Sequence, residues 1–284
     1  MIFPSSFAVT CGVAAALLAQ PETRSGLADV LGAKLYFEDT GGTGEPVVFL
    51  HAATGSTRSW EHQVPAFRAA GYRVITFDRR GFGRSERDPA GPAGTAADDL
   101  AALAAHLGLG RFHLVGVAAG GFVALDYAVS FGPSLRSLVF AHSMGLVQDP
   151  EFLEMGRRIR PQAFEGLPLE FKELSPSYRA ANPEGTKRWL EIASSNRPQG
   201  AEGARQPVKN RMTAERLASL AMPMLLVAGE SDFYMPPPLM RLMAARIPHA
   251  RTAVVSESAH ASFWEQPDVF NREVLAFIGA HLGS

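Results

Sequence analysis

Residues 116–120, Gly-Val-Ala-Ala-Gly, place an alanine at the centre of a glycine-flanked turn that follows an apolar run. With serine at position 118, this spacing is a sharp strand-to-helix turn that lifts a reactive hydroxyl above a sheet. Such a hydroxyl attacks a carbonyl carbon and forms an acyl intermediate. Ala118 has no hydroxyl. The rest of the chain therefore decides what a site without this nucleophile can do.

A serine-type site also needs a base that takes the proton of the nucleophile and an acid that orients the base. Asp232 follows the apolar run 225–229, and His260 follows the next strand-like run and precedes the final helix. Because both residues come after consecutive strands, we assign Asp232 as the acid and His260 as the base. Glu230 and Glu257 are the rival candidates for the acid.

Two backbone N–H groups are needed to stabilise the negative charge that develops on a carbonyl oxygen. We expect Ala119, which follows the nucleophile position, to supply one of them. The other is expected from the turn after the apolar run 47–50. Ala53 is our choice in that turn, with Ala52 and Thr54 as alternatives.

Other motifs carry weaker signals. The run around His142 superficially resembles a nucleophile turn, but it lacks the glycine two residues before Ser143 that keeps such a turn free of clashes. We therefore expect no catalytic role for His142. The spacing from Gly116 to Gly120 is not the Gly-x-Gly-x-x-Gly fingerprint of a dinucleotide site. The eight histidines show no metal-ligand spacing, so we expect neither a metal nor a cofactor.

Positioning these residues requires alternating strands and helices. Short apolar runs bounded by turn residues predict strands buried on both faces, at 46–50, 72–77, 112–117, 135–141, 222–229 and 251–255, after an early strand at 33–38. Helical spacing of apolar residues is found at 58–70, 96–107, 121–130, 237–247 and 267–281. This alternation predicts an α/β fold with a mostly parallel central sheet flanked by helices.

The alternation is interrupted once, which predicts an insertion. The interrupting segment is rich in Arg, Glu, Pro and aromatic residues, with helix-like pieces at 149–159 and 183–195. Because long loops without structure are uncommon in compact domains, we interpret the segment as a helical lid. The predicted parts are an N-terminal extension, an α/β core and the lid, at residues 1–30, 31–144 with 210–284, and 145–209.

Composition narrows the classes of partner. A formal net charge of −1 gives no electrostatic footprint for nucleic acid or for a membrane surface, so we expect a small-molecule substrate. The single cysteine, Cys11, excludes an intrachain disulfide. The apolar run Phe7–Ala19 could be a signal segment, but no Lys or Arg precedes it. We expect a cytoplasmic protein, with export as the alternative, and leave the oligomeric state open.

Four motifs resemble those of the α/β-hydrolase superfamily, and the likeness covers nearly everything after residue 30. His-Ala-Ala at 51–53 is similar to the oxyanion turn of that family, and residues 78–85 are similar to its D-x-R-G-x-G-x-S turn. The turn at Ala118 and the endings at Asp232 and His260 complete the likeness. The chain is most similar to lid-bearing esterases, enol-lactonases and carbon–carbon bond hydrolases. The resemblance implies the fold, but the chain departs from it at Ala118.

Three functions fit this pattern. The first is a hydrolase of small carboxylic esters or lactones in which the serine at position 118 has been replaced by alanine, as in an engineered knockout. In the second, Ala118 is native and His260 acts as a general base for direct attack by water or for a lyase step. The third is a non-catalytic protein that binds a small ligand under its lid. A pocket for an apolar or aromatic molecule with a carboxylate, bound by a lid arginine, is a further possibility.

Overall fold

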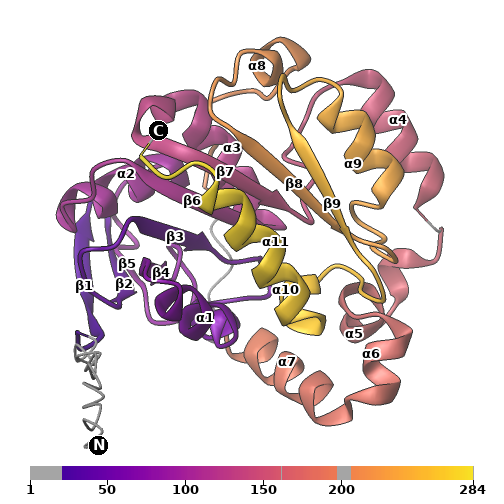
Figure 1. Cartoon of the computed structure of the whole chain (residues 1–284), viewed down its shortest axis with the longest axis horizontal. Helices are drawn as coiled ribbons and strands as arrows, with labels where there is room; N and C mark the ends of the chain where they lie inside the picture. The colour runs from indigo at the N-terminus through magenta and orange to yellow at the C-terminus, as the bar shows by residue number, and fades with distance from the viewer. Residues whose placement is uncertain (1–20, 161, 197–205, 284) are drawn as a thin grey trace, which may run out of the picture.

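The computed structural model describes residues 21–160, 162–196 and 206–283. Its centre is one sheet with the strand order β1-β2-β4-β3-β6-β7-β8-β9, and β5 pairs with β2 (Figure 1). The strands from β4 to β9 along this order are parallel, and β2 pairs antiparallel with its neighbours. The strands are β1 Arg24–Val30, β2 Ala33–Asp39, β3 Pro46–Leu50, β4 Arg73–Phe77, β5 Glu86–Arg87, β6 Phe112–Val117, β7 Leu135–Ala141, β8 Met224–Gly229 and β9 Arg251–Val255.

Helices cover both faces of the sheet, as the sequence predicts. Alternate residues of β3 show why: Val48 and Leu50 pack into one apolar core, whereas Val47 and Phe49 pack into the other. The first core lies under α2 Ala96–His106, α3 Ala119–Phe131 and α9 Pro237–Ala244. The second lies under α1 Gln63–Ala69, α10 Ser262–Glu265 and α11 Pro267–Gly279. Burial on both faces explains the continuous apolar runs of the central strands.

The two edges of the sheet differ from the prediction. Residues 24–30 pair with β2 as β1, so the sheet begins before residue 31, where the sequence places the start of the core. β9 is predicted to be buried on both faces, and this is wrong. Arg251, Thr252 and Val254 of β9 are exposed, because β9 is the last strand in the sheet order and has a neighbour on one side only.

A group of helices follows β7 in the chain and precedes β8. The helices at 149–159 and 183–195 are confirmed almost residue for residue, and the described part of 145–209 contains no strand. α5, α6 and α7 lie together near α10 (Figure 1), where Trp189 of α7 contacts Trp264 with ring centroids 5.5 Å apart. The division into core and lid stays a prediction. The elements are α4 Pro150–Ile159, η3 Phe164–Gly166, α5 Leu169–Glu173, α6 Pro176–Ala181 and α7 Pro183–Ser195, and α8 Ala214–Ala218 follows.

The predictions for the N-terminus cannot be compared with the fold, because Phe7–Ala19 and Cys11 lie outside the described residues. Elsewhere, across the residues that the structure describes, no helix is both long enough and apolar enough to cross a bilayer. The described residues from 21 onward form the sheet, the helices that cover it, the helices between β7 and β8, and the segments that connect these elements. Residues 161, 197–205 and 284 are not described.

Candidate active site

Ala118 lies between β6 and α3 in a strained conformation. Its φ of 48° and ψ of −116° fall in a region that residues other than glycine rarely adopt, and where such residues occur they cluster at functional sites. The Ala118 N–H donates to the carbonyl of Ala141 at 3.0 Å, and its carbonyl accepts from Ser143 Oγ at 2.6 Å. The Gly121 N–H donates to the same carbonyl at 3.0 Å. These contacts hold the turn that the sequence predicts.

The glycines of the motif are required by close backbone contacts. A Cβ at Gly120 would lie 2.2 Å from the carbonyl oxygen of Leu50 and 2.8 Å from that of His51. A Cβ at Gly116 would lie 2.8 Å from the Cβ of Ala124. The absence of a side chain at Gly120 therefore lets the turn pack against the end of β3, and its absence at Gly116 lets β6 pack against α3.

Gly120→Ala is expected to lower the free energy of unfolding by about 2 kcal/mol, because the added methyl group collides with backbone atoms that cannot rotate away. Gly110→Ala is the matched control, since a Cβ at Gly110 would meet nothing within 4 Å. Urea denaturation of the two variants and the parent chain measures the effect. Equal stability of the two variants would contradict the packing described for the turn.

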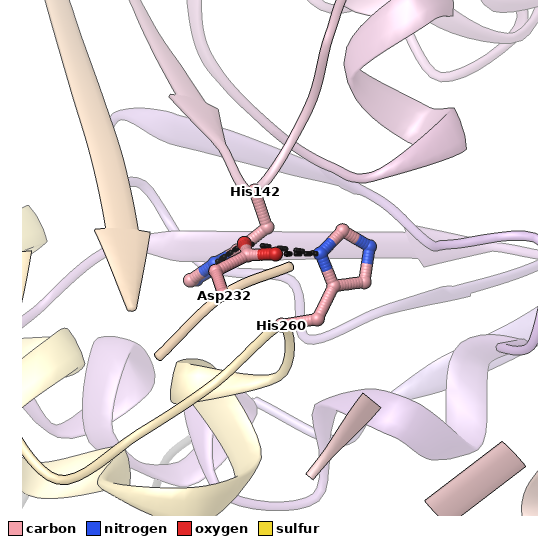
Figure 2. A group of neighbouring side chains, drawn as sticks. All are labelled: His142, Asp232 and His260. Carbon is pink, nitrogen blue, oxygen red and sulfur yellow. Dashed lines mark hydrogen bonds and ion pairs between the residues drawn. The ribbon is translucent and has the colours of Figure 1, made fainter. Parts of the chain in front are cut away.

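The predicted acid and base are in direct contact. His260 Nδ1 lies 2.9 Å from Asp232 Oδ1 and 3.0 Å from Oδ2. Figure 2 shows the second ring nitrogen of His260, Nε2, on the side of the ring away from Asp232. Glu230 and Glu257, the rivals for the acid, are both exposed. The Glu257 N–H donates to Glu230 Oε2 at 3.1 Å. The geometry therefore favours Asp232 as the partner of His260.

The Asp232 carboxylate is buried and accepts several hydrogen bonds. The N–H groups of Tyr234 and Met235 donate to Oδ1 at 2.8 and 3.1 Å. Burial alone would raise the pKa of Asp232, but the charge of His260 and hydrogen bonds from His142 and His260 outweigh burial and hold this pKa far below its usual range. Asp232 is therefore an ionised acceptor that keeps the proton of His260 on Nδ1.

His142 is the residue that sequence reasoning passed over. It follows β7 directly, and Figure 2 shows it facing Asp232 on the side opposite His260. Its Nδ1 lies 3.1 Å from Asp232 Oδ2, and its Nε2 lies 2.7 Å from Ser262 Oγ. Burial lowers the pKa of His142, which favours the neutral ring. In that form Nδ1 donates to Asp232 and Nε2 accepts from Ser262, so His142 helps to fix the carboxylate. Its place at the carboxyl end of a strand was the signal that could have revealed it.

His142, Asp232 and His260 are also the described residues that could hold a metal ion, since one ligand atom from each lies within 4.8 Å of the others. However, both Nδ1 atoms lie at hydrogen-bond distance from the carboxylate, between 2.9 and 3.1 Å. All three side chains are buried. A metal ion would have to replace these bonds, so the arrangement fits a hydrogen-bonded acid–base group better than a set of metal ligands.

The turn after β3 contains Ala53, one of the two residues predicted to supply an oxyanion amide. His51 Nε2 accepts the Arg79 N–H at 2.9 Å, so His51 Nδ1 carries the proton and donates to the Ala52 carbonyl at 2.7 Å. This bond fixes the turn in which Ala53 lies. Ala53 and Ala119 line one cavity, and Ala119 is the first residue of α3. The N-terminal end of α3, where the helix dipole is positive, therefore borders this cavity.

The motif at residues 78–85 contacts the segment that follows this turn. The Asp78 carboxylate accepts the Thr57 N–H at 2.7 Å and the Arg84 N–H at 2.8 Å. Thr57 begins η1, Thr57–Trp60, directly after the oxyanion turn. Gly83 has a φ of 52°, and a Cβ there would lie 2.2 Å from Asp78 Oδ2. Burial raises the pKa of Asp78. These contacts give the motif a structural role that its position in the sequence did not reveal.

The site opens on a cavity of about 290 Å³. Ala118 is half-buried on its wall, and His260 contributes another part of the wall. α5 contributes two residues, Leu169 and Glu173. The remaining lining residues are Ala52, Ala53, Thr54, Ala119, Phe122, His142, Ser143, Met144 and Tyr234. The nucleophile position, the base and the two residues predicted to supply the oxyanion amides therefore line the same cavity.

The sequence matches the alpha/beta hydrolase fold family over residues 45–267. The chain belongs to this family. This α/β hydrolase is 32% identical over 261 residues to a putative non-heme bromoperoxidase, BpoC, of Mycobacterium tuberculosis. The match covers 85% of this chain and 97% of that protein.

Solved structures agree with this assignment. A thermophilic esterase from Thermogutta terrifontis, with malate bound, superposes with a TM-score of 0.74 at 27% identity, over 92% of this chain and 99% of that one. Est816, described as an N-acyl homoserine lactone degrading enzyme, superposes with a TM-score of 0.72 at 28% identity, over 89% of this chain and all of that one (100%). The relatives of this α/β hydrolase include enzymes that act on small molecules, and the resemblance inferred from the sequence motifs is confirmed.

Proposed function

We propose that this α/β hydrolase cleaves a small carboxylic ester or lactone in the cavity lined by Ala118 and His260. The observation that carries the proposal is the contact between His260 and Asp232 at 2.9 Å, on the wall of a cavity that also holds both proposed oxyanion amides. Such an arrangement serves acyl transfer. The likeness to an esterase and to a lactone-degrading enzyme supports the same class of substrate.

The proposed roles follow from the charges that form during the reaction. The substrate carbonyl oxygen lies between the N–H groups of Ala53 and Ala119, which stabilise it as it becomes negative. His260 Nε2 takes a proton from the attacking group, and the adjacent Asp232 carboxylate stabilises the imidazolium that forms. The same proton then passes from His260 to the departing alkoxide, which leaves as an alcohol.

Because Ala118 has no hydroxyl, no covalent acyl intermediate can form at this position of the chain. The remaining nucleophile is water: its oxygen bonds to the carbonyl carbon while one of its protons moves to His260 Nε2. The tetrahedral intermediate then collapses to an acid and an alcohol. We propose that this route is slow, because the residual catalysis of a triad without its nucleophile comes from the oxyanion hole and from binding alone.

The complete Asp232/His260 pair also supports a second candidate. In it, attack by water, or a lyase step, with His260 as general base is the full activity of the enzyme and needs no serine. Restoring a hydroxyl at position 118 discriminates between the two, because only the first candidate gains from it. Tight binding of a ligand without turnover, indifferent to His260→Ala, would instead favour the non-catalytic alternative.

Hydrolysis of short p-nitrophenyl esters and of simple lactones by the parent chain tests the proposal. We expect a rate above the buffer rate for at least one of these substrates, lost in His260→Ala. A parent chain that is inactive on every ester and lactone, and that stays inactive as Ala118→Ser, would contradict it.

The pH dependence of kcat/KM follows from the surroundings of His260. Burial lowers the pKa of His260, but the charge of Asp232 and its hydrogen bond outweigh burial and raise this pKa above its ordinary value of 6.5. Only the neutral ring can take a proton, so activity is expected to rise with pH and to have its half-maximum above pH 6.5. Asp232→Asn should shift the half-maximum to lower pH. A half-maximum at or below pH 6.5 in the parent would contradict this assignment.

A further inference from the structure

Glu173 is a buried carboxylic acid that the proposed mechanism does not use. It is the last residue of α5 and lies on the wall of the cavity that Ala118 and His260 also line. Only 6% of its surface is exposed. The hydroxyl of Thr54, next to the proposed oxyanion residue Ala53, donates to Glu173 Oε2 at 3.3 Å. The helix thus places a carboxyl group on the wall of this cavity, in contact with the turn that holds Ala53.

The charged groups around Glu173 do not form an ion pair that would keep it ionised. Burial raises the pKa of Glu173 and the charge of Asp232 raises it further, whereas the charges of His260 and Lys172 and the hydrogen bond from Thr54 lower it but are not enough to reverse the shift. The ammonium of Lys172 lies 6.0 Å from the ring of Phe164. A buried carboxyl group in these surroundings favours its neutral form, in which it can donate a hydrogen bond.

We propose that Glu173 selects the substrate: its carboxyl group donates a hydrogen bond to an uncharged acceptor oxygen that lies beside the scissile carbonyl group, while the cavity wall around it disfavours substrates with a carboxylate at that place. This inference deepens the proposed ester or lactone hydrolysis and rests on it. The substrate class is therefore a neutral oxo, hydroxy or alkoxy ester or lactone.

The rest of the cavity wall agrees with this selection. No Lys or Arg stands among its described lining residues, so the lid arginine that the sequence made possible is not found at the cavity. Phe122, Met144 and Leu169 line it with apolar surface. A carboxylate would lose its hydration there without gaining a lysine or arginine partner, which is costly. A neutral acceptor loses less and gains the hydrogen bond from Glu173.

Three p-nitrophenyl esters of nearly equal shape test the proposal: the pentanoate, the 4-oxopentanoate and the hydrogen succinate. The 4-oxopentanoate has one acceptor oxygen more than the pentanoate. The hydrogen succinate differs from the 4-oxopentanoate in one group, because an ionisable hydroxyl replaces the terminal methyl group of the 4-oxopentanoate. The measurements use the full chain carrying Ala118→Ser, so that turnover is readily followed. Glu173→Gln keeps a neutral donor, Glu173→Leu removes it, and Glu170→Gln on the same helix is the matched control, since Glu170 does not line the cavity.

With Glu173 present, kcat/KM for the 4-oxopentanoate is expected to exceed that for the pentanoate by about tenfold, the effect of one net hydrogen bond, mainly through KM. The ratio should persist in Glu173→Gln and in the control, and fall to about one in Glu173→Leu. It should decline as pH rises and Glu173 ionises, but stay constant in Glu173→Gln. The titration of His260 cancels in the ratio. The hydrogen succinate should be the poorest of the three substrates. At high pH, where Glu173 is ionised and repels the succinate carboxylate, Glu173→Gln should hydrolyse it faster than the chain that keeps Glu173.

The inference is overturned if the ratio is near one with Glu173 present, or if Glu173→Leu leaves it unchanged. A ratio that has the same pH dependence in Glu173→Gln would also overturn it. Failure of the proposed function has a different signature, because none of the three esters would then be hydrolysed. If Glu173→Leu does not fold, the comparison of Glu173→Gln with the parent across pH decides the question alone.

Discussion

Replacing Ala118 with serine is expected to raise kcat for p-nitrophenyl ester hydrolysis by about 10³-fold to 10⁶-fold, since loss of a serine nucleophile from such a unit typically costs up to about 10⁶-fold. The backbone already has the required conformation, with φ 48° and ψ −116°, and it is fixed by hydrogen bonds to β7 and to Ser143. The substitution adds one oxygen to a half-buried methyl group on the wall of a cavity. The gain should therefore come without refolding of the turn.

Two controls accompany this variant. Ala105→Ser makes the same chemical change at an exposed position of α2 and should leave kcat unchanged. Ser143→Ala in the Ala118→Ser chain shows whether the neighbouring hydroxyl, which donates to the Ala118 carbonyl, contributes a nucleophile of its own. A rate for Ala118→Ser within tenfold of the parent would contradict the covalent route and favour the general-base candidate.

His260→Ala in the Ala118→Ser chain is expected to remove almost the whole of that gain. Residues that act as one catalytic unit are strongly non-additive, so the double variant should return to within about tenfold of the parent rate. The physical reason is that the serine proton has no acceptor once the imidazole is gone, and Asp232 is too far buried behind His260 to replace it. Kinetics of the four chains of this cycle measure the coupling.

His106→Ala serves as the control for His260→Ala, because His106 is exposed at the end of α2. Thermal unfolding of each variant checks that the fold is kept. This check is needed because His260→Ala removes a hydrogen-bond donor from the buried Asp232 carboxylate, and a buried charge that loses a partner lowers stability. A double variant that keeps most of the rate of Ala118→Ser would show that another base takes the proton, and the assignment of His260 would be wrong.

The central strands and the predicted pair were accessible to sequence reasoning for a physical reason. Strands buried on both faces appear as continuous apolar runs, and the ends of parallel strands bring Asp232 and His260 to one edge. Glycines with close backbone neighbours, such as Gly120, mark the turn at Ala118. These features depend on local sequence and on the regular geometry of the sheet.

Other features depend on contacts that no local pattern reveals. The bond between His142 and Asp232 joins residues 90 positions apart, so the sequence showed His142 only as an isolated histidine. Glu173 lies on the cavity wall at the end of α5, a helix of only five residues between β7 and β8, and no local pattern places that helix. The burial of β9 was misjudged because residues 253–255, Ala-Val-Val, resemble the apolar run of a central strand, whereas the place of β9 at the edge of the sheet depends on the strand order, which no local pattern reveals.

Covalent labelling tests the central claim most directly, namely that position 118 is the nucleophile position of a hydrolase site in which His260 is the base. A fluorophosphonate is incubated with the parent chain, with Ala118→Ser and with Ala118→Ser/His260→Ala, and the labelled residue is located by mass spectrometry of peptides. The account predicts rapid modification of residue 118 in Ala118→Ser, and little or none in the parent and the double variant. An unlabelled Ala118→Ser chain, or equal labelling of the parent at Ser143, would contradict it.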